Sequence, residues 1–401
     1  MTPRVLIVED GLGPHPLAAT RSFGAAGWYV GTGSLTPGGR ADSSRWAAAW
    51  HHVPPAEQDW EAFLAATRQA VAEGGYDLVF GADDVEVLAL SAGRGTLGAL
   101  FPYADHESLV RAVDKLTLTR AAEAAGLAVP RTASPEEGPT ALPFPVVVKA
   151  RVHWTPGQRD VPARLDRSFC TTPAELERAV ARIAAAGGGA VVQEVVGGDL
   201  MAVTLLLDRS GRRLATVQQR ARRISPYWHN SVRAETVPVD PDLTAACERM
   251  LHDLGWWGLA NLQFLAPSDG GAPRLIDFNG RFYGSLALAG AAGCDLPVLW
   301  ARAALEPSSS PGEPVTGTAG VRYQSLEEDL RRALVERHGG LVQDVAETLR
   351  TARGAVHSTW SAEDLRPALR RSRQLLRAEA GELARRSARA VLHRRGAHPI
   401  R

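Results

Sequence analysis

The sequence predicts an α/β and α+β protein, with a small parallel-sheet domain first, an α+β module in the middle and a mostly helical C-terminal region. Over residues 1–105, short apolar runs alternate with helical stretches, a pattern typical of a parallel sheet. The middle of the chain holds pairs of apolar strands separated by turn residues, which indicate hairpins. The stretch 306–319 is rich in Pro and Ser, as linkers are, and helical periodicity follows it.

The composition excludes several classes of protein. The 401 residues carry a formal net charge of +1, so no overall field argues for a nucleic-acid partner. No run of about 18 apolar residues occurs, so we expect no transmembrane segment. The cysteines Cys170, Cys247 and Cys294 lack metal-type spacing and fit a reducing compartment. We therefore expect a cytoplasmic protein without a nucleic-acid partner, and the sequence leaves its oligomeric state open, a homodimer included.

The N-terminal domain begins with the apolar strand Val5–Val8, followed by two glycines and a helix over residues 16–26. Gly11 and Gly13 are too few and too irregular for a dinucleotide-binding fingerprint, so we interpret them as turn residues. Further strands are expected at residues 28–30 and 76–80, and further helices after Asp59 and after Asp83 or Asp84.

A hairpin near residue 270 organises the middle module. Leu259–Leu265 and Leu275–Phe278 read as strands, and the turn Pro267–Pro273 separates them. Antiparallel pairing across this turn sets Gln263 opposite Asp277. Directly opposed residues have Cβ atoms about 5 Å apart, so we expect these two side chains to be neighbours.

This hairpin collects oxygen ligands on one face. Side chains alternate along a strand, so Asp277 and Asn279 point to the same side. With Gln263 they form a set of hard oxygen donors with little charge, which suits Mg²⁺ that is shared with phosphate groups. Arg281 follows as a cation donor. The alternative interpretation is an ordinary solvated sheet edge.

Lysine is scarce in this chain. Of the 45 Lys and Arg residues, only Lys115 and Lys149 are lysines. A lysine ammonium is a compact point charge that suits a phosphate oxygen, whereas the guanidinium fork of arginine is bulkier. Lys115 lies at the start of a helix that follows Asp114, and Lys149 ends the strand Pro143–Lys149. The alternative is that both lysines survived compositional drift by chance.

The motifs around these residues resemble the ATP-grasp superfamily, which includes biotin carboxylase, carbamoyl-phosphate synthase and D-alanine ligase. The resemblance rests on Asn-Leu-Gln263-Phe, then Ile-Asp277-Phe-Asn279-Gly-Arg281 and Gly-Ser285-Leu. The family pattern has Glu or Gln on the first strand and Glu-x-Asn-x-Arg on the second, so Asp277 is one methylene shorter. Within the superfamily, the segment through Pro297 resembles carboxylate-amine ligase-like proteins.

The resemblance implies a nucleotide site and its boundaries. An ATP-grasp domain would span residues 106–305, with a lid subdomain at about 116–195, and the remainder, 320–401, would be a C-terminal region. Lys115 and Lys149 would contact the α- and β-phosphates. Glu194 and Val196 would hold the adenine at a hinge, and Asp199 would bind the ribose hydroxyls, with a simple turn aspartate as the alternative.

The resemblance also implies a reaction centre. Gln263, Asp277 and Asn279 would hold one or two Mg²⁺ ions, with Mn²⁺ as an alternative ion. Arg281 would hold the transferring phosphoryl group or the acyl oxygen. Arg220 and Arg223 would approach the γ-phosphate and the acceptor carboxylate, although such a run of arginines is often a solvated face.

One segment departs from the family pattern, and the role of a second segment is left open by the sequence. The loop 151–160, where the family has a Gly-rich phosphate loop, contains only Gly157, and Arg151 or Arg159 is the alternative source of positive charge. The basic tail 366–401 has helical spacing of its apolar residues. We expect that it packs on the body of the protein, and the alternative is a basic helix on an anionic surface.

The resemblance finally implies an activity. ATP would lie between two sheets, and the enzyme would join a carboxylate to an amine through an acyl phosphate, releasing ADP and phosphate. A kinase-like phosphoryl transferase on the same scaffold is one alternative. A nucleotide-binding module with little turnover is another.

Overall fold

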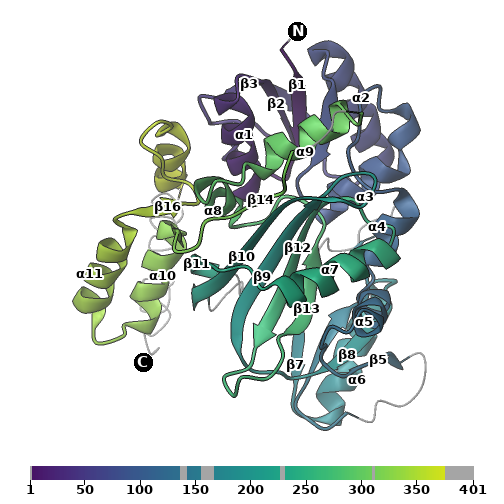
Figure 1. The fold of residues 1–401 in the computed structure, drawn as a ribbon, viewed down its shortest axis with the longest axis vertical. Helices are drawn as coiled ribbons and strands as arrows, with labels where there is room; N and C mark the ends of the chain where they lie inside the picture. The colour runs from purple at the N-terminus through teal and green to yellow at the C-terminus, as the bar shows by residue number, and fades with distance from the viewer. Residues whose placement is uncertain (1, 136–141, 155–166, 226–230, 309–311, 375–401) are drawn as a thin grey trace, which may run out of the picture.

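The computed structural model describes residues 2–135, 142–154, 167–225, 231–308 and 312–374, whose strands form three sheets (Figure 1). The first sheet is parallel and has the order β3-β2-β1-β4. Its strands are β1 Arg4–Val8, β2 Tyr29–Ser34, β3 Ala47–His52 and β4 Leu78–Gly81. The predicted parallel-sheet domain is therefore confirmed, although β3, with the sequence Ala-Ala-Ala-Trp-His-His, carries no β-branched residue and was not predicted.

Helices cover this sheet and begin where side chains cap them. The Asp59 carboxylate accepts a hydrogen bond from the Ala62 amide, and Asp83 forms a capping box with Glu86. The helix predicted after Asp83 or Asp84 thus has Asp83 as its N-cap. The helices are α1 His15–Ala25, α2 Trp60–Gly74, α3 Asp84–Ala92 and α4 His106–Val113, with a 3₁₀ turn at Arg94–Thr96.

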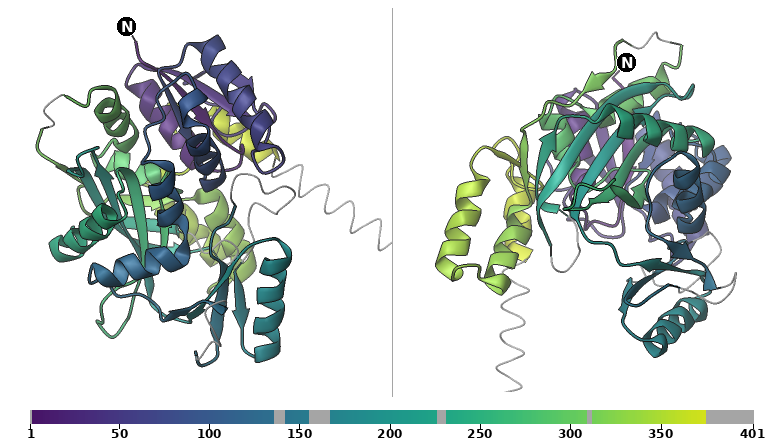
Figure 2. Two further views of the ribbon diagram at one scale, coloured as in Figure 1. Left: turned by 90° about the vertical axis from the view of Figure 1, so that its right-hand side faces the viewer. Right: turned by 60° about the horizontal axis from the view of Figure 1, so that its bottom comes forward.

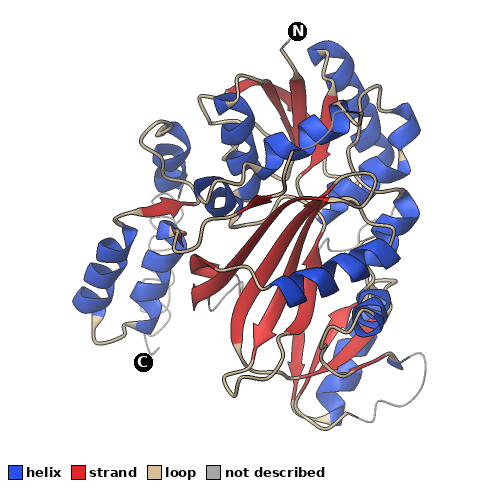
Figure 3. Ribbon diagram, viewed as in Figure 1, coloured by secondary structure: helices blue, strands red, loops and turns tan. Residues whose placement is uncertain are grey.

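The second sheet is the largest and has the order β13-β12-β9-β10-β11-β15-β16, with β14 beside β10. Its strands are β9 Asp199–Leu207, β10 Arg213–Ile224, β11 Ser231–Val237, β12 Gly258–Ala266, β13 Arg274–Asn279, β14 Val315–Thr316, β15 Arg322–Gln324 and β16 Ala355–His357. The predicted hairpin is β12–β13, and its register places Gln263 opposite Asp277 as expected. Figure 3 shows α7, Pro241–Asp253, lying across one face of this central sheet.

The third sheet is small and has the order β5-β8-β6-β7. Its strands are β5 Thr132–Ala133, β6 Val146–Ala150, β7 Ser168–Cys170 and β8 Ala190–Glu194, and α6, Pro173–Ala185, packs against them. Thr172 and Glu175 form the capping box that starts α6. Residues 195–198 join β8 directly to β9, so the predicted hinge segment is the link between the small sheet and the central sheet.

One hydrophobic core joins the N-terminal domain to the central sheet. Phe80 on β4 lies 5.2 Å, centroid to centroid, from Phe282, which follows β13, and 5.0 Å from Trp300 on α9. Apolar burial on this scale fixes the two sheets relative to each other. The helices of this region are α5 Lys115–Ala124, α8 Leu286–Ala291 and α9 Leu296–Leu305.

The C-terminal region continues the central sheet and then turns helical. β15 and β16 pair with each other and with β11, and the stretch 306–319 contributes β14. The helices α10, Leu326–Glu336, and α11, Leu341–Ala352, lie at the end of the central sheet opposite the small sheet (Figures 1 and 2). Most of the basic tail, residues 375–401, lies outside the described residues. Within the described ranges, no helix is long and apolar enough to cross a membrane.

Candidate active site

Lys115 stands at the first turn of α5. The helix begins there because the Asp114 carboxylate accepts hydrogen bonds from the amides of Leu116 and Thr117, at 2.9 and 3.0 Å. The Lys115 ammonium lies 4.0 Å from Asp277 Oδ1 and 3.4 Å from His153 Nε2. A cation at the start of one helix thus faces the end of β13.

Lys149 approaches the same strand from the small sheet. It is on β6, and its ammonium donates to the backbone carbonyl of Ile276 at 3.3 Å. Burial lowers the pKa of Lys149 to about 8; the Asp277 carboxylate opposes this shift, and the Lys115 ammonium adds to it. Two ammonium groups share one carboxylate here, and an anionic ligand would relieve their repulsion.

Backbone and side-chain bonds fix the two lysine-bearing elements to each other. The Lys115 amide donates to the Arg151 carbonyl at 3.0 Å, and the Arg151 guanidinium donates to Asp114 Oδ2 at 2.7 Å. Arg151, proposed from the sequence as a loop charge, is therefore bonded to the N-cap of α5. Arg159 and Gly157 lie outside the described residues.

The three expected metal ligands lie on one face of the β12–β13 hairpin. Gln263 is directly opposite Asp277, and Asn279 is two residues further along β13. The Asp277 side chain is 41% exposed. Burial by itself would raise the pKa of Asp277, but the ammonium groups of Lys115 and Lys149 lower it overall, so the carboxylate stays charged.

Arg281 is held by the N-terminal domain. Its guanidinium lies 2.8 Å from Asp84 Oδ1 and 3.3 Å from Asp83 Oδ1, and it donates to the Phe282 carbonyl at 2.9 Å. The residue is only 5% exposed. Burial would lower the pKa of Arg281, but the two carboxylates raise it overall, so the guanidinium stays charged. In this structure Arg281 links α3 to the end of β13.

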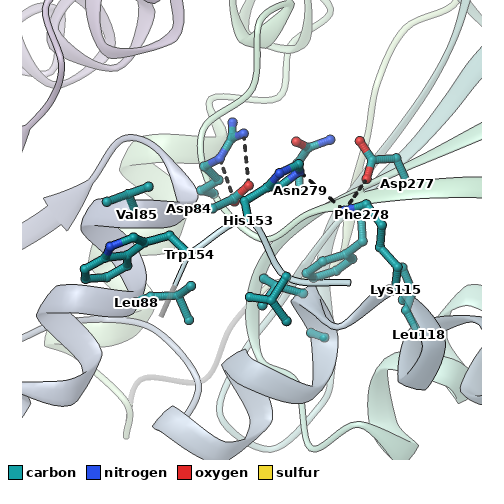
Figure 4. A pocket seen from close by; sticks show the side chains of 14 residues that line it. Asp84, Val85, Leu88, Lys115, Leu118, His153, Trp154, Asp277, Phe278 and Asn279 are labelled. Carbon is teal, nitrogen blue, oxygen red and sulfur yellow. Dashed lines mark hydrogen bonds and ion pairs between the residues drawn. The ribbon is translucent and has the colours of Figure 1, made fainter. Parts of the chain in front are cut away.

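A pocket lies between the N-terminal domain and β13 (Figure 4). It brings together Lys115, Asp277, Asn279 and Arg281, four of the residues expected from the sequence. Its other lining residues come mainly from α3, α4, α5 and the segment after β6; they are Asp84, Val85, Leu88, Ala112, Val113, Leu118, Val152, His153, Trp154 and Phe278. No sequence motif indicated a role for His153 or Trp154, which lie in the loop 151–160, and Asp84 was expected only at the start of a helix.

Arg220 faces away from this pocket. It pairs with Met201, and Met201 pairs with Phe264, whereas Gln219 pairs with Ala202 and Ala202 with Gln263. Paired residues share a face and successive residues alternate. Arg220 is therefore on the face of the central sheet opposite Gln263, against the expectation that it approaches the reaction centre.

Arg223 belongs to a different cluster. It donates to Asp329 Oδ1 at 3.0 Å and to Asp344 Oδ1 at 2.9 Å, and Arg233 also donates to Asp329. Both aspartate side chains are completely buried. These bonds tie β10 and β11 to α10 and α11, so the structure gives Arg223 a packing environment rather than the reaction-centre position expected from the sequence.

The segment expected to hold adenine lies between the small sheet and the central sheet. Glu194 ends β8, and its carboxylate accepts hydrogen bonds from the Arg131 amide at 3.0 Å and from the Arg131 guanidinium at 2.7 Å. Burial would raise the pKa of Glu194, and these bonds lower it overall. Val196 is half-buried in the link, and the exposed Asp199 begins β9.

The donor set fits a triphosphate with a hard cation. The lysine pair supplies positive charge, and the ionised Asp277 lies beside the amide-bearing Asn279. Among the described residues, no three His, Cys, Asp or Glu side chains are grouped so as to hold a metal ion. A cation at this hairpin would therefore complete its shell with amide, water and phosphate oxygens, as Mg²⁺ commonly does.

Comparisons with known proteins show what the fold and one segment of the chain are similar to. Residues 189–328 match the family described as ATP-grasp in the biosynthetic pathway with Ter operon. The fold is similar to that of an L-amino acid ligase from Bacillus licheniformis, with 16% identity, coverage of 76% of this chain and 74% of that chain, and a TM-score of 0.57. The comparison with curated protein sequences gave no match.

Two further solved structures are similar. The biotin carboxylase domain of 2-oxoglutarate carboxylase from Hydrogenobacter thermophilus, in complex with MgADP, ADP and bicarbonate, has 14% identity, coverage of 80% of this chain and 73% of that chain, and a TM-score of 0.61. N5-carboxyaminoimidazole synthetase from Staphylococcus aureus, complexed with ADP, has 13% identity, coverage of 80% and 82%, and a TM-score of 0.58. These matches show that the chain shares its fold with these enzymes and that residues 189–328 resemble an ATP-grasp family.

Proposed function

We propose that the protein is an ATP-dependent ligase that joins a carboxylate to an amine. The observation that carries the proposal is the convergence of the chain's two lysines on β13: Lys115 lies 4.0 Å from Asp277, and Lys149 donates to the Ile276 carbonyl, on the strand that also bears Asn279. The similar structures include an L-amino acid ligase and ADP complexes, which supports the same class of reaction here.

In this proposal the phosphates of ATP bind to Lys115 and Lys149, and the base binds near Glu194 and Val196, with Asp199 near the ribose. Gln263, Asp277 and Asn279 hold one or two Mg²⁺ ions. Bound Mg²⁺ neutralises the charge that builds on the phosphate oxygens during transfer.

The substrate carboxylate attacks the γ-phosphorus, which breaks the bond to the β-phosphate oxygen and releases ADP. The resulting acyl phosphate is attacked by an amine, so a C–N bond forms and phosphate leaves. The ammonium groups of Lys115 and Lys149 stabilise the negative charge that moves onto ADP. The burial of Lys149 and the near-burial of the Lys115 side chain strengthen these interactions, because charges interact more strongly where the effective dielectric constant is lower than in water.

Arg281 has a positioning role in this proposal. Its bonds to Asp83 and Asp84 hold the guanidinium at the end of β13, two residues beyond Asn279. From there it orients the acyl oxygen or the transferred phosphoryl group. Two carboxylates from the N-terminal domain thus position an arginine at the end of β13 for the reaction.

The test measures ADP release by the purified protein with ATP, Mg²⁺ and a panel of amino acids and small carboxylates. We expect ADP only with the correct carboxylate, and hydroxylamine should trap the acyl phosphate as a hydroxamate. Asn279→Ala should lower the rate about 10- to 100-fold while the unfolding temperature stays the same. Equal rates for this variant and the native protein would refute the metal assignment, and a stable phosphorylated product would indicate a kinase instead.

A further inference from the structure

The pocket beside β13 has two chemically different sides. Figure 4 shows Lys115 and Asp277 at one side, and Val85, Leu88 and Trp154 at the other. Val85 and Leu88 belong to α3 of the N-terminal domain, and Trp154 follows β6 of the small sheet. These three residues form what we call the apolar side of the pocket, and the reaction proposed above gives them no role.

Trp154 is buried, and the hydrogen-bonding capacity of its indole is unused. The residue is only 1% exposed, and in the described parts of the chain its Nε1 atom has no hydrogen-bond partner. A buried indole N–H usually has an acceptor, because an unpaired buried donor lowers stability. Since Trp154 lines the pocket, its N–H is available to an acceptor atom of a ligand.

The free space in the pocket is small. Its volume is about 40 Å³, and one water-sized group needs roughly 10–15 Å³ of such space, so about three non-hydrogen atoms fit without the movement of a side chain. This size admits a propyl or isopropyl group and excludes a phenyl or indolyl ring.

The proposed reaction determines which part of a substrate meets the apolar side. The substrate carboxylate attacks a phosphoryl group whose metal ions are held at Asp277 and Asn279, so the carboxylate lies at that side of the pocket. The rest of the substrate then extends toward Val85, Leu88 and Trp154. An apolar group is favoured there because its surface is removed from water, whereas a charged group would lose its hydration without a partner.

We propose that Trp154 determines specificity by donating its indole N–H to an acceptor on a short, mainly apolar side chain of the carboxylate substrate. The inference rests on the proposed ligase function and names its substrate class. That class is a carboxylic acid whose side chain has about three non-hydrogen atoms, one of them an oxygen acceptor. Val85 and Leu88 contact the carbon atoms of this side chain. With Trp154 they bound the space, so longer side chains are rejected.

The first experiment compares matched acids in one protein. O-methylserine and norvaline have side chains of equal length, and threonine and valine have side chains of equal shape; only the first acid of each pair carries an acceptor. We expect kcat/KM for ADP release to favour the acceptor about threefold to tenfold in at least one pair, because a hydrogen bond forms to a donor that is otherwise unpaired. Trp154→Phe keeps an aromatic ring without the N–H and should bring that ratio close to one.

Trp256→Phe is the matched control for this substitution. Trp256 is also buried, and its Nε1 atom also lacks a partner among the described residues, but it is not one of the residues that line the pocket. This variant should keep the native ratio. Because each ratio compares two acids in the same protein, a general loss of folded protein cancels. A native ratio near one for both pairs, or an unchanged ratio in Trp154→Phe, overturns the proposal.

The second experiment separates this proposal from the ligase proposal by measuring binding without turnover. The unfolding temperature is recorded with each of the four acids, and in the native chain the acceptor-bearing acid should raise it more than its matched acid does. In Trp154→Phe the two rises should be equal.

The outcomes distinguish the two proposals. The expected binding pattern without carboxylate-dependent ADP release removes the ligase function and leaves the contact to Trp154 standing. ADP release that is fastest with glutamate or phenylalanine leaves the ligase function standing and removes the proposed substrate class. No response of the native chain to any of the four acids, in ADP release or in unfolding temperature, overturns the proposed role of Trp154.

Discussion

The protein contains two clusters of charged side chains that differ in how completely their charges are matched. At the C-terminal end of the central sheet, Arg223 and Arg233 are bonded to Asp329, and Arg223 also to Asp344. Near the β12–β13 hairpin, two lysines face one partly exposed aspartate: Lys115 lies 4.0 Å from its carboxylate, and Lys149 donates to the backbone carbonyl of Ile276. A cluster in which every arginine is paired with a carboxylate holds its helices and strands together. Two lysines beside a single carboxylate carry an excess positive charge, which an anionic ligand can neutralise.

The largest effect is expected from a substitution in the arginine–aspartate cluster at the C-terminal end of the central sheet. Asp329→Asn should lower the free energy of unfolding by about 3–5 kcal/mol, because it leaves two largely buried guanidinium groups without their shared carboxylate. Urea unfolding followed by circular dichroism measures the change. Lys149→Met is the matched comparison, and its free energy of unfolding should stay within about 1 kcal/mol of the native value. Equal losses in the two variants would remove the distinction between the clusters.

A smaller effect is expected from a substitution that tests why a lysine, rather than an arginine, stands near the β12–β13 hairpin. Lys149→Arg keeps the positive charge but replaces a compact ammonium with a planar fork, so carboxylate-dependent ADP release should fall about 100-fold. Steady-state kinetics measures the rate, and thermal unfolding shows whether the fold is kept. Full activity in this variant would refute the interpretation of lysine scarcity as a functional signal.

The smallest expected effect is a dependence of nucleotide affinity on pH. The free Lys149 pKa is about 8, so its ammonium is charged below pH 8 and loses its proton above it. Bound phosphates raise that pKa in the complex, and the affinity for ADP should therefore fall as pH rises above 8, by at most about tenfold per pH unit. Calorimetric titrations between pH 7 and 9.5 measure this. Lys149→Arg should remove the Lys149-dependent part of the slope, because arginine stays charged over the whole range.

Local features of the structure could be predicted from the sequence. The alternation of apolar and polar residues on both strands predicts the hairpin pairing, and Gln263 lies opposite Asp277 as expected. Helix starts at Asp59, Asp114 and Thr172 follow from side chains that bond to amides two or three residues away. The paired lysines were found because the chain otherwise uses arginine.

Contacts between distant segments could not be predicted in this way. Arg281 meets Asp84 across 197 residues, and Arg223 meets Asp344 across 121. Nothing in the local pattern of an arginine indicates which carboxylate it will find after folding.

The most direct test of the central claim is calorimetric binding of a non-hydrolysable ATP analogue with Mg²⁺ to the native chain and to Lys115→Met/Lys149→Met. The account predicts that the native chain binds the analogue and that the double variant, still folded, binds it at least about 100-fold more weakly, because two ammonium contacts to phosphate are lost. Equal affinity in the two proteins would contradict the claim that these lysines and Asp277 form a triphosphate site.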